Sequence, residues 1–264
     1  MSAVTIDKEK TIVSGQEAHR IGDCIIALGE KLLRYGGEVS RVEDTVYRLG
    51  VAYGFRSVDC LTIMNCIVAS FVCSDGDSFT QMRRVLEIRK DMEKIRACNE
   101  LSRAACRKPL GPEEFEERLR GIEELRGYIP WQMCLVYMLT SASMTLFFGG
   151  SLHDAMASAI AGVALYLSGR LMDFARIQNF VTAYIEAFMV GMSICLLIKL
   201  GLGDNYDLIS MGNIMLMISG SGLMTSVRDM INNDILSGMM GLLSAVIGAA
   251  AIALGFVSAA LLFM

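Results

Sequence analysis

The stretch "FVTAYIEAFMVGMSICLLIKL", Phe180 to Leu200, decides the fold. It is as long as the run of about 20 apolar residues that a helix needs to cross the hydrocarbon core of a bilayer. Its one acid, Glu186, lies inside the run, and its one base, Lys199, lies at the end. The stretch therefore predicts a transmembrane helix that carries an acid.

The composition of the whole chain agrees with a membrane protein. Of its 264 residues, 53% are hydrophobic and 20% are charged, and the mean hydropathy is +0.47. Most of the charged residues precede Tyr128, and the sequence after this point is largely apolar. This asymmetry predicts an α+β N-terminal domain over residues 1–127 and an all-α membrane domain of about five transmembrane helices over residues 128–264.

Charge and cysteine usage exclude several classes of protein. A net charge of -4 offers no basic field for nucleic acid. The N-terminal segment "MSAVTIDKEKTIVSGQEAHR" lacks the apolar run of a secretory signal, so the N-terminal domain is expected in the cytosol. The eight cysteines then correspond to reduced thiols, without a CxxC pair or enough histidines for a metal site. We expect no metal, no cofactor and no catalytic residue.

Five apolar runs are candidate spans, and short connections separate them. They are Pro130 to Phe148, Ala155 to Gly169, Phe180 to Leu200, Leu208 to Val227 and Ile235 to Met264. The second run is the shortest. Arginines concentrate before the first run, between the second and third, and after the fourth. The positive-inside rule then places the N-terminus in the cytoplasm and the C-terminus outside.

Small residues repeat every three or four positions along the last span. They are Gly241, Ser244, Ala245, Gly248, Ala251, Gly255, Ser258 and Ala259. Such a stripe lets two helices approach closely in lipid. The partner helix belongs either to this chain or to a second subunit.

The N-terminal part shows the patterns of four helices and about three strands. Helices are expected over Gln16 to Arg34, Glu38 to Tyr53, Asp91 to Ala105 and Pro112 to Leu125, with strands between Ser57 and Val85. Tyr35-Gly36-Gly37 ends the first helix, and it lacks the sequence of a phosphate-binding loop. Asp44 and Arg48 have the spacing of an ion pair on a helix face.

Charged residues within the membrane half are candidates for function. Placing Glu186 inside the membrane costs several kcal/mol of free energy unless it is paired, protonated or exposed to water, which favours a functional role. The alternative is a tilted helix that places Glu186 near the cytosolic interface. Ser219, Gly220 and Gly222 weaken the fourth span, and broken helices expose backbone groups to substrates. The following segment, "SVRDMINND", carries Arg228, Asp229 and Asp234, and it forms either a site or a plain cytosolic turn.

Two separated motifs resemble those of the ThrE-like threonine/serine exporter family. In "LLRYGGEVSRVEDTVYRLGVAYG" the matching residues are Gly37, Arg41, Val42, Glu43 and Asp44, and in "TSVRDMINNDILSG" they are Arg228, Asp229, Asp234 and Gly238. This chain departs from the family pattern in having Ser219-Gly220 where proline-glycine is usual, and Asn233-Asp234 where glycine-aspartate is usual.

The resemblance implies a secondary exporter of small polar metabolites in a bacterial inner membrane. With one membrane block, the chain resembles the larger component of the split branch, whose small membrane partner supplies a second block in a hetero-oligomer. The implied substrates are threonine/serine-type amino acids or dicarboxylates such as succinate.

A hypothesis for the site follows from the charges. Arg228 would bind a substrate carboxylate, and Asp229 or Glu186 would exchange a coupling proton. The alternative from another class is a cytosolic enzyme or sensor domain that its helices tether to the membrane.

Overall fold

The computed structural model describes residues 15–263 apart from Met64, Glu87, Arg126 and residues 176–178. The chain divides into two compact units, which are described separately below. The first unit contains the residues up to 126 together with Thr225–Met240, and the second contains Gly127–Met224 and the chain from Gly241 onward. The corner between the last two helices therefore groups with the N-terminal residues.

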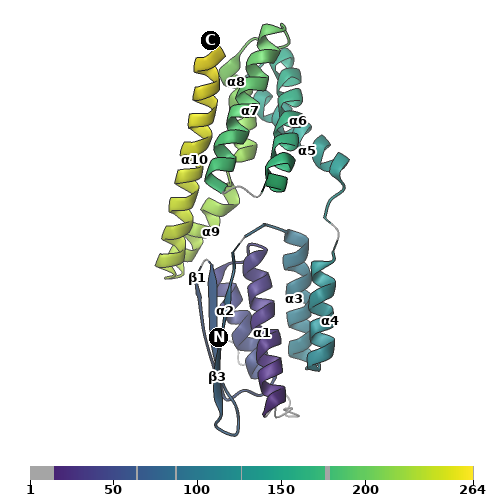
Figure 1. Ribbon diagram of the computed structural model, residues 1–264, viewed down its shortest axis with the longest axis vertical. Coiled ribbons are helices and arrows are strands. Elements are labelled where there is room, and N and C mark those ends of the chain that lie inside the picture. The colour runs from purple at the N-terminus through teal and green to yellow at the C-terminus, as the bar shows by residue number, and fades with distance from the viewer. Residues whose placement is uncertain (1–14, 64, 87, 126, 176–178, 264) are drawn as a thin grey trace. The chain divides into compact units, whose positions relative to one another are not determined.

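The first unit has the expected mixture of helices and strands. Its N-terminal elements are α1 (Gln16–Arg34), α2 (Val39–Ala52), β1 (Ser57–Ile63), β2 (Cys66–Val72), β3 (Ser78–Arg84), α3 (Met92–Arg107) and α4 (Pro112–Glu123) (Figure 1). The predicted four helices and three strands are confirmed, and each helix begins within one residue of the expected position. Local periodicity was sufficient because each element keeps one apolar face.

The three strands form an antiparallel sheet in the order β1-β2-β3, and α1 and α2 pack on it. In β2 the side chains of Ile67, Ala69 and Phe71 are fully buried, while the alternate residues are half-buried. Gly29 lets α1 lie close to the sheet, because a Cβ there would be 2.7 Å from Cδ1 of Ile67. This contact joins the helices and the sheet in one core.

A tight turn separates α1 from α2. Gly36 has φ +87°, a conformation that side chains disfavour, and the amide of Gly37 donates to the carbonyl of Leu32 at 2.8 Å. The glycines therefore end the helix, as predicted. The turn fixes the start of α2, where Glu38 precedes the first helical residue.

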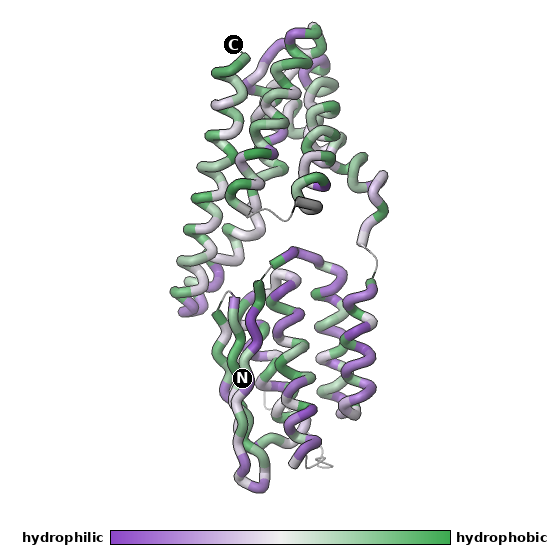
Figure 2. The backbone as a smooth tube through the Cα atoms, in the orientation of Figure 1, coloured by the Kyte–Doolittle hydropathy of each residue, from purple (hydrophilic) through white to green (hydrophobic). Residues whose placement is uncertain are grey.

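The remaining helices are mostly apolar. They are α5 (Pro130–Phe147), α6 (Leu152–Ala175), α7 (Asn179–Lys199), α8 (Tyr206–Met217), α9 (Gly220–Ile231) and α10 (Ile235–Phe263). Figure 2 shows them largely in the colour of hydrophobic residues. Among the described residues, three helices are long and apolar enough to cross a membrane, or four if α8 and α9 form one broken span. The three are α6, α7 and α10, so α5 is not among them.

Two expectations about the spans have clear outcomes. The helix expected over Leu208 to Val227 is broken as predicted, since α8 and α9 are separated by Ile218 and Ser219 and are bent by 51°. The second candidate span is present but extends beyond its expected bounds, because α6 has 24 residues and its apolar part runs over Leu152–Met172. The helix begins before Ala155 and continues through Arg170. The expected last residue, Met264, lies outside the described residues.

Part of the small-residue stripe on α10 packs against α7 of the same chain. A Cβ on Gly255 would lie 2.6 Å from Cβ of Ala187, and one on Gly191 would lie 2.7 Å from Cβ of Ala259. Close helix packing of this kind supplies the contact that burial of apolar surface cannot supply in lipid. The stripe therefore has an intramolecular partner along these turns.

Polar side chains join α5, α6 and α8 inside the second unit. The hydroxyl of Ser141 donates to Oδ1 of Asn213 at 2.8 Å, and the hydroxyl of Thr145 donates to Oγ of Ser158 at 2.7 Å. Nδ2 of Asn213 also donates to Oγ of Ser158 at 3.1 Å, and all four residues are fully buried. The satisfied network holds three helices in register.

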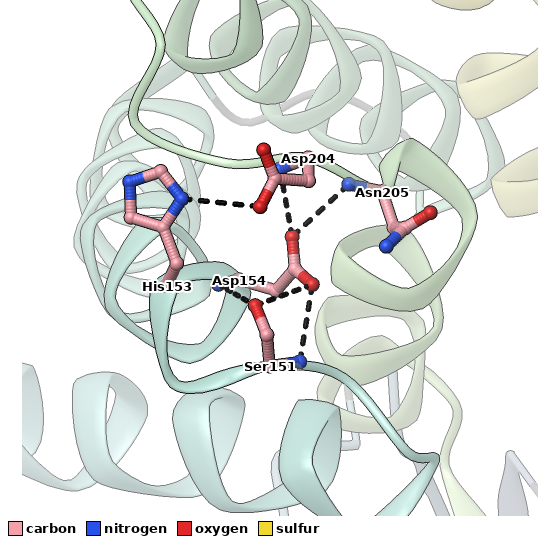
Figure 3. Close-up of polar contacts among 5 residues, drawn as sticks. All are labelled: Ser151, His153, Asp154, Asp204 and Asn205. Carbon is pink, nitrogen blue, oxygen red and sulfur yellow. Dashed lines mark hydrogen bonds and ion pairs between the residues drawn. The ribbon is translucent and has the colours of Figure 1, made fainter.

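Asp154 joins the start of α6 to the start of α8 through hydrogen bonds (Figure 3). Its Oδ2 accepts from the amide and hydroxyl of Ser151 at 3.1 and 2.9 Å, which forms a capping box with the Ser151 hydroxyl. Its Oδ1 accepts from the amides of Asp204 and Asn205 at 2.8 and 3.0 Å. The fully buried carboxylate therefore has four donors, which identifies it as structural.

Replacing Asp154 by asparagine will destabilise the protein. The amide can no longer accept from all four donors, and we expect a loss of about 2–4 kcal/mol in the free energy of unfolding. The matched control is Asp204→Asn, since the Asp204 side chain is 68% exposed and is joined only to His153, at 3.3 Å, among the contacts drawn in Figure 3. Thermal unfolding in detergent measures both variants, and equal melting temperatures would contradict the structural role.

Candidate functional site

A cavity of about 450 Å³ lies within the second unit. Its lining comes from the residue Tyr128 before α5 and from the helices α5, α6, α7 and α8. These helices contribute Met133 and Tyr137 (α5), Leu165, Tyr166, Gly169 and Arg170 (α6), Glu186 (α7), and Leu216 and Met217 (α8). The last two residues end α8, directly before the helix break. The volume is in the range of sites for small molecules.

Glu186 contributes an acid to this cavity. A Cβ on Gly169 would lie 3.7 Å from Oε1 of Glu186, so the carboxylate faces α6, from which Arg170 also lines the cavity. Glu186 is half-buried and Arg170 is exposed. An acid and a base on two apolar helices therefore line the same cavity of about 450 Å³.

Two tyrosines complete the polar lining. The rings of Tyr137 and Tyr166 are 5.6 Å apart and tilted by 59°. Their hydroxyl groups are both donors and acceptors of hydrogen bonds. Sequence reasoning missed Tyr137, Tyr166 and Arg170 as site residues. The spacing of Tyr166 and Arg170, four residues apart on α6, was the available signal, because it places both on one helix face.

A second charged cluster lies in the first unit. Nη1 of Arg228, near the end of α9, donates to Oε1 of Glu38 at 2.7 Å, and Nδ2 of Asn232 lies 3.5 Å from Oγ of Ser40. Arg228 is 61% exposed, and Glu38 is 25% exposed. The partners are 190 residues apart in sequence. The two motifs that resemble the exporter family therefore meet in space.

Asp229 is buried beside this ion pair. It is 5% exposed, and its Oδ1 has no hydrogen-bond partner among the residues that the structure describes, which is unusual for a buried carboxylate. The like charges of Asp234 and Glu38 and the opposite charge of Arg228 act on it. The corner that holds it is tight, because a Cβ on Gly238 would lie 2.6 Å from the carbonyl oxygen of Ser226.

Asp234 follows a strained backbone position at that corner. Asn233 has φ 69°, and the amide of Asp234 donates to the carbonyl of Asp229 at 2.9 Å. Asparagine tolerates this left-handed conformation better than most residues do. The departure to Asn233-Asp234 from the family pattern is therefore compatible with the same turn.

The N-terminal motif residues have structural contacts. Oε1 of Glu43 accepts from the amide of Thr62 at 2.7 Å, which links α2 to β1, and Arg48 pairs with Asp44 at 2.8 Å as predicted. Arg41 is exposed, and its carbonyl accepts from the hydroxyl of Thr45 at 2.8 Å. Burial raises the pKa of Glu43, the Thr62 amide opposes that shift, and the charge of Asp234 adds to it.

The predicted site residues therefore separate into groups. Glu186 lines the cavity of the second unit, whereas Arg228, Asp229 and Asp234 lie at the α9–α10 corner of the first unit. Ser219 lies in the break, and its carbonyl accepts from the amide of Gly222 at 3.0 Å. Gly220 begins α9. Which of these residues bind substrate or ions stays a prediction.

The pH dependence of stability tests the environment of Glu43. Since the pKa of Glu43 is raised in the folded protein, folding favours its protonated form, and the stability that this form contributes is lost as pH rises from 4.5 through the higher pKa of the folded state. Glu43→Gln keeps an acceptor for Thr62 and removes this loss. We expect the melting temperature of the variant, relative to the wild type, to rise from pH 4 to pH 7. Glu43→Ala, which also loses the hydrogen bond, should be less stable than Glu43→Gln at every pH, and parallel pH profiles of the wild type and Glu43→Gln would contradict the assignment.

A charge exchange tests the contact between the two motifs. Arg228→Glu and Glu38→Arg should each destabilise the protein, because each places like charges together. The double variant should recover about 0.3–1 kcal/mol of the summed loss, a range typical of an exposed pair. Chemical unfolding of the four proteins gives this coupling energy, and additive single effects would show that the two residues do not interact.

Comparisons with known proteins agree with the resemblance. The model of the family described as "ThrE: Putative threonine/serine exporter" matches residues 23–263. A protein of Klebsiella aerogenes named "Probable succinate transporter subunit YjjP" is 27% identical over 210 residues, which cover 79% of this chain and 80% of that protein. The protein of the same name from Escherichia coli K12 is 25% identical over 215 residues, with 81% and 83% covered.

No solved structure matches the chain significantly. The family match covers both units and includes both motifs that meet at the contact of Arg228 with Glu38. The chain therefore belongs to the ThrE exporter family.

Proposed function

We propose that the chain is the larger subunit of a two-chain secondary exporter, which moves small polar metabolites out across a bacterial inner membrane. The observation that carries this proposal is the cavity that Glu186 and Arg170 both line, on two apolar helices. A helix that serves only as a tether has no need for an acid and a base around a cavity. Family membership and the transporter subunits among the relatives support the same function.

The chemistry of the cavity suits a small molecule with a carboxylate. The guanidinium of Arg170 can bind a carboxylate through two parallel hydrogen bonds. Ionised Glu186 would bind the ammonium group of a threonine/serine-type amino acid, and protonated Glu186 would donate to the second carboxylate of a dicarboxylate such as succinate. The hydroxyls of Tyr137 and Tyr166 would bind either substrate. The two substrate classes thus differ in the charge of one acid.

Proton coupling follows from the same chemistry. An acid that changes its charge with substrate occupancy links transport to the proton gradient, and Glu186 or the buried Asp229 would fill this role. Leu216 and Met217 place the end of α8 against the cavity, so movement at the adjacent break would change its shape. Arg228 stays a second candidate for binding carboxylate, but it would have to release Glu38 to do so.

The proposed topology keeps the N-terminus in the cytoplasm and the C-terminus outside. It counts α5 and the broken pair of α8 and α9 as spans in addition to α6, α7 and α10. A small membrane protein would supply the second membrane block. Large apolar side chains exposed on α5 and α10 provide surface for lipid and for that partner, namely Leu135, Val136, Leu139, Leu243, Val246 and Leu254.

Efflux from preloaded cells tests the proposal. Cells that express this chain together with its small membrane neighbour should release labelled succinate or threonine, and each chain alone should not. Glu186→Gln and Arg170→Gln should reduce the rate to below about a tenth of the wild-type value at equal surface levels. Asp207→Asn, which changes an exposed acid on α8, is the matched control and should leave efflux unchanged.

Two results would contradict the proposal. Normal efflux by Glu186→Gln and Arg170→Gln would exclude the cavity as the substrate site. No efflux of either compound, with both chains in the membrane, would favour the tethered enzyme or sensor domain, or another substrate.

A further inference from the structure

A second cavity, of about 340 Å³, lies wholly within the first unit. Its lining brings together the end of α1, the connection from β3 to α3, the start of α3 and the end of α4. The lining residues are Arg34, Tyr35, Arg89, Lys94 and Glu123. Three of the five are cations.

Backbone hydrogen bonds fix the positions from which these side chains extend. The amide of Arg89 donates to the carbonyl of Arg34 at 2.8 Å, and the amide of Asp91 donates to the carbonyl of Tyr35 at 3.2 Å. Asp91 then caps α3 by accepting from the amide of Lys94 at 3.1 Å. The backbones of Arg34 and Arg89 are therefore hydrogen-bonded to each other, although the two residues are far apart in sequence. The cations converge because the chain connection is attached to the end of α1.

The single carboxylate of the lining is already bound by other groups. Lys31, which is 13% exposed, forms an ion pair with Glu123, and Nζ of Lys94 donates to the backbone carbonyl of Glu123 at 2.9 Å. The hydrogen bond from Lys31 holds the pKa of Glu123 below its usual value, and the charges of Arg34 and Lys94 contribute to this shift. The cations thus outnumber the acid at this site in a chain whose net charge is -4.

Tyr35 adds an aromatic ring to the lining of the cavity. Tyr35 is 7% exposed, and Nζ of Lys94 lies 5.3 Å from the centre of its ring. Burial raises the pKa of its hydroxyl, which therefore stays a neutral hydrogen-bond donor and acceptor. Two guanidinium groups, an ammonium group and a phenol therefore line a cavity whose volume is in the range of metabolite sites. Guanidinium groups bind carboxylates and phosphates through paired hydrogen bonds.

We propose that this cavity binds a small organic dianion from solution, carrying two carboxylates or one phosphate. The anion would lie between Arg34 and Arg89, with Lys94 and the hydroxyl of Tyr35 as further donors. Glu38, the partner of Arg228, follows Tyr35 by three residues on the other side of the Gly36 turn. The bound anion would therefore lie next to the segment that contacts the α9–α10 corner. This binding site does not depend on the proposed transport site.

Calorimetric titration of the full chain in neutral-lipid nanodiscs tests the proposal. The probes are succinate and inorganic phosphate, with acetate as the monoanion, all at constant ionic strength. A background of Glu186→Gln with Arg170→Gln removes the charges of the cavity in the second unit. We expect saturable binding of at least one dianion, with a dissociation constant about tenfold or more below that of acetate. Heats without saturation would overturn the proposal.

Variants in the cavity identify the site. Arg34→Gln combined with Arg89→Gln should weaken dianion binding by about tenfold or more, because two paired hydrogen-bonding groups are lost. Arg34→Lys keeps the charge and should weaken it less. Arg118→Gln is the matched control, since it changes an exposed arginine of α4 that pairs with Glu114. Equal affinities of the double variant and this control would overturn the proposal, and unchanged melting temperatures verify folding.

The source of the anion is tested by the lipid composition. Dianion binding that is equal in neutral and anionic nanodiscs is expected for a site that faces solution. Competition by anionic lipid would overturn the assignment to a free dianion, because headgroup phosphates would then occupy the site.

Discussion

The cost of leaving a charge or a backbone group without a partner in hydrocarbon constrains the second unit more than any other interaction. Asp154 meets this constraint through four donors that join α6 to α8, and Ser141 and Asn213 meet it through a network across three helices. These polar residues hold the helices in position. Glu186 differs from them because it lines a cavity that also holds Arg170. Burial of an acid among apolar helices is therefore not sufficient evidence of a functional role. What separates the two acids is their location, since Asp154 joins the starts of two helices and has a structural role, whereas Glu186 lines a cavity and remains the candidate.

The two family motifs contact each other at the α9–α10 corner. Arg228 is paired with Glu38, and Asp229 lies buried next to it with one oxygen atom that has no partner. An ion pair whose arginine is 61% exposed contributes little stability, so its value lies in setting the position of the corner on α2. Asp229 then carries a large desolvation cost in its charged form, which a change of protonation or of contacts would relieve. The corner follows the helix break directly in the sequence, and the N-terminal motif contacts that corner through Glu38.

The two cavities differ in charge, and this difference separates their roles. The cavity of the second unit contains one acid and one base, which suits a molecule that carries both signs or an acid that changes its protonation. The cavity of the first unit contains three cations and one carboxylate that Lys31 already binds, which suits an anion. Each cavity is lined by the last residue of a helix, which is Met217 of α8 in the second unit and Arg34 of α1 in the first. Helix ends provide such places because side chains and free backbone groups converge there.

The sequence by itself determined the local features, because they depend on neighbours within about four residues. Apolar periodicity defined α1 to α4, Gly36 ended α1, Asp44 paired with Arg48, and Ser219-Gly220 interrupted the fourth span. The length of α6 was underestimated, since its first turn depends on a capping box and its last turns carry the charged residues Arg170 and Asp173. Only the tertiary structure decided which charges meet: Glu38 with Arg228 across 190 residues, Asp154 with the Asp204 amide across 50. Side-chain type and spacing along the chain do not encode such contacts, because they arise from the packing of whole helices. For the same reason Arg170, Tyr137 and Tyr166 became candidates only when three helices placed them around Glu186.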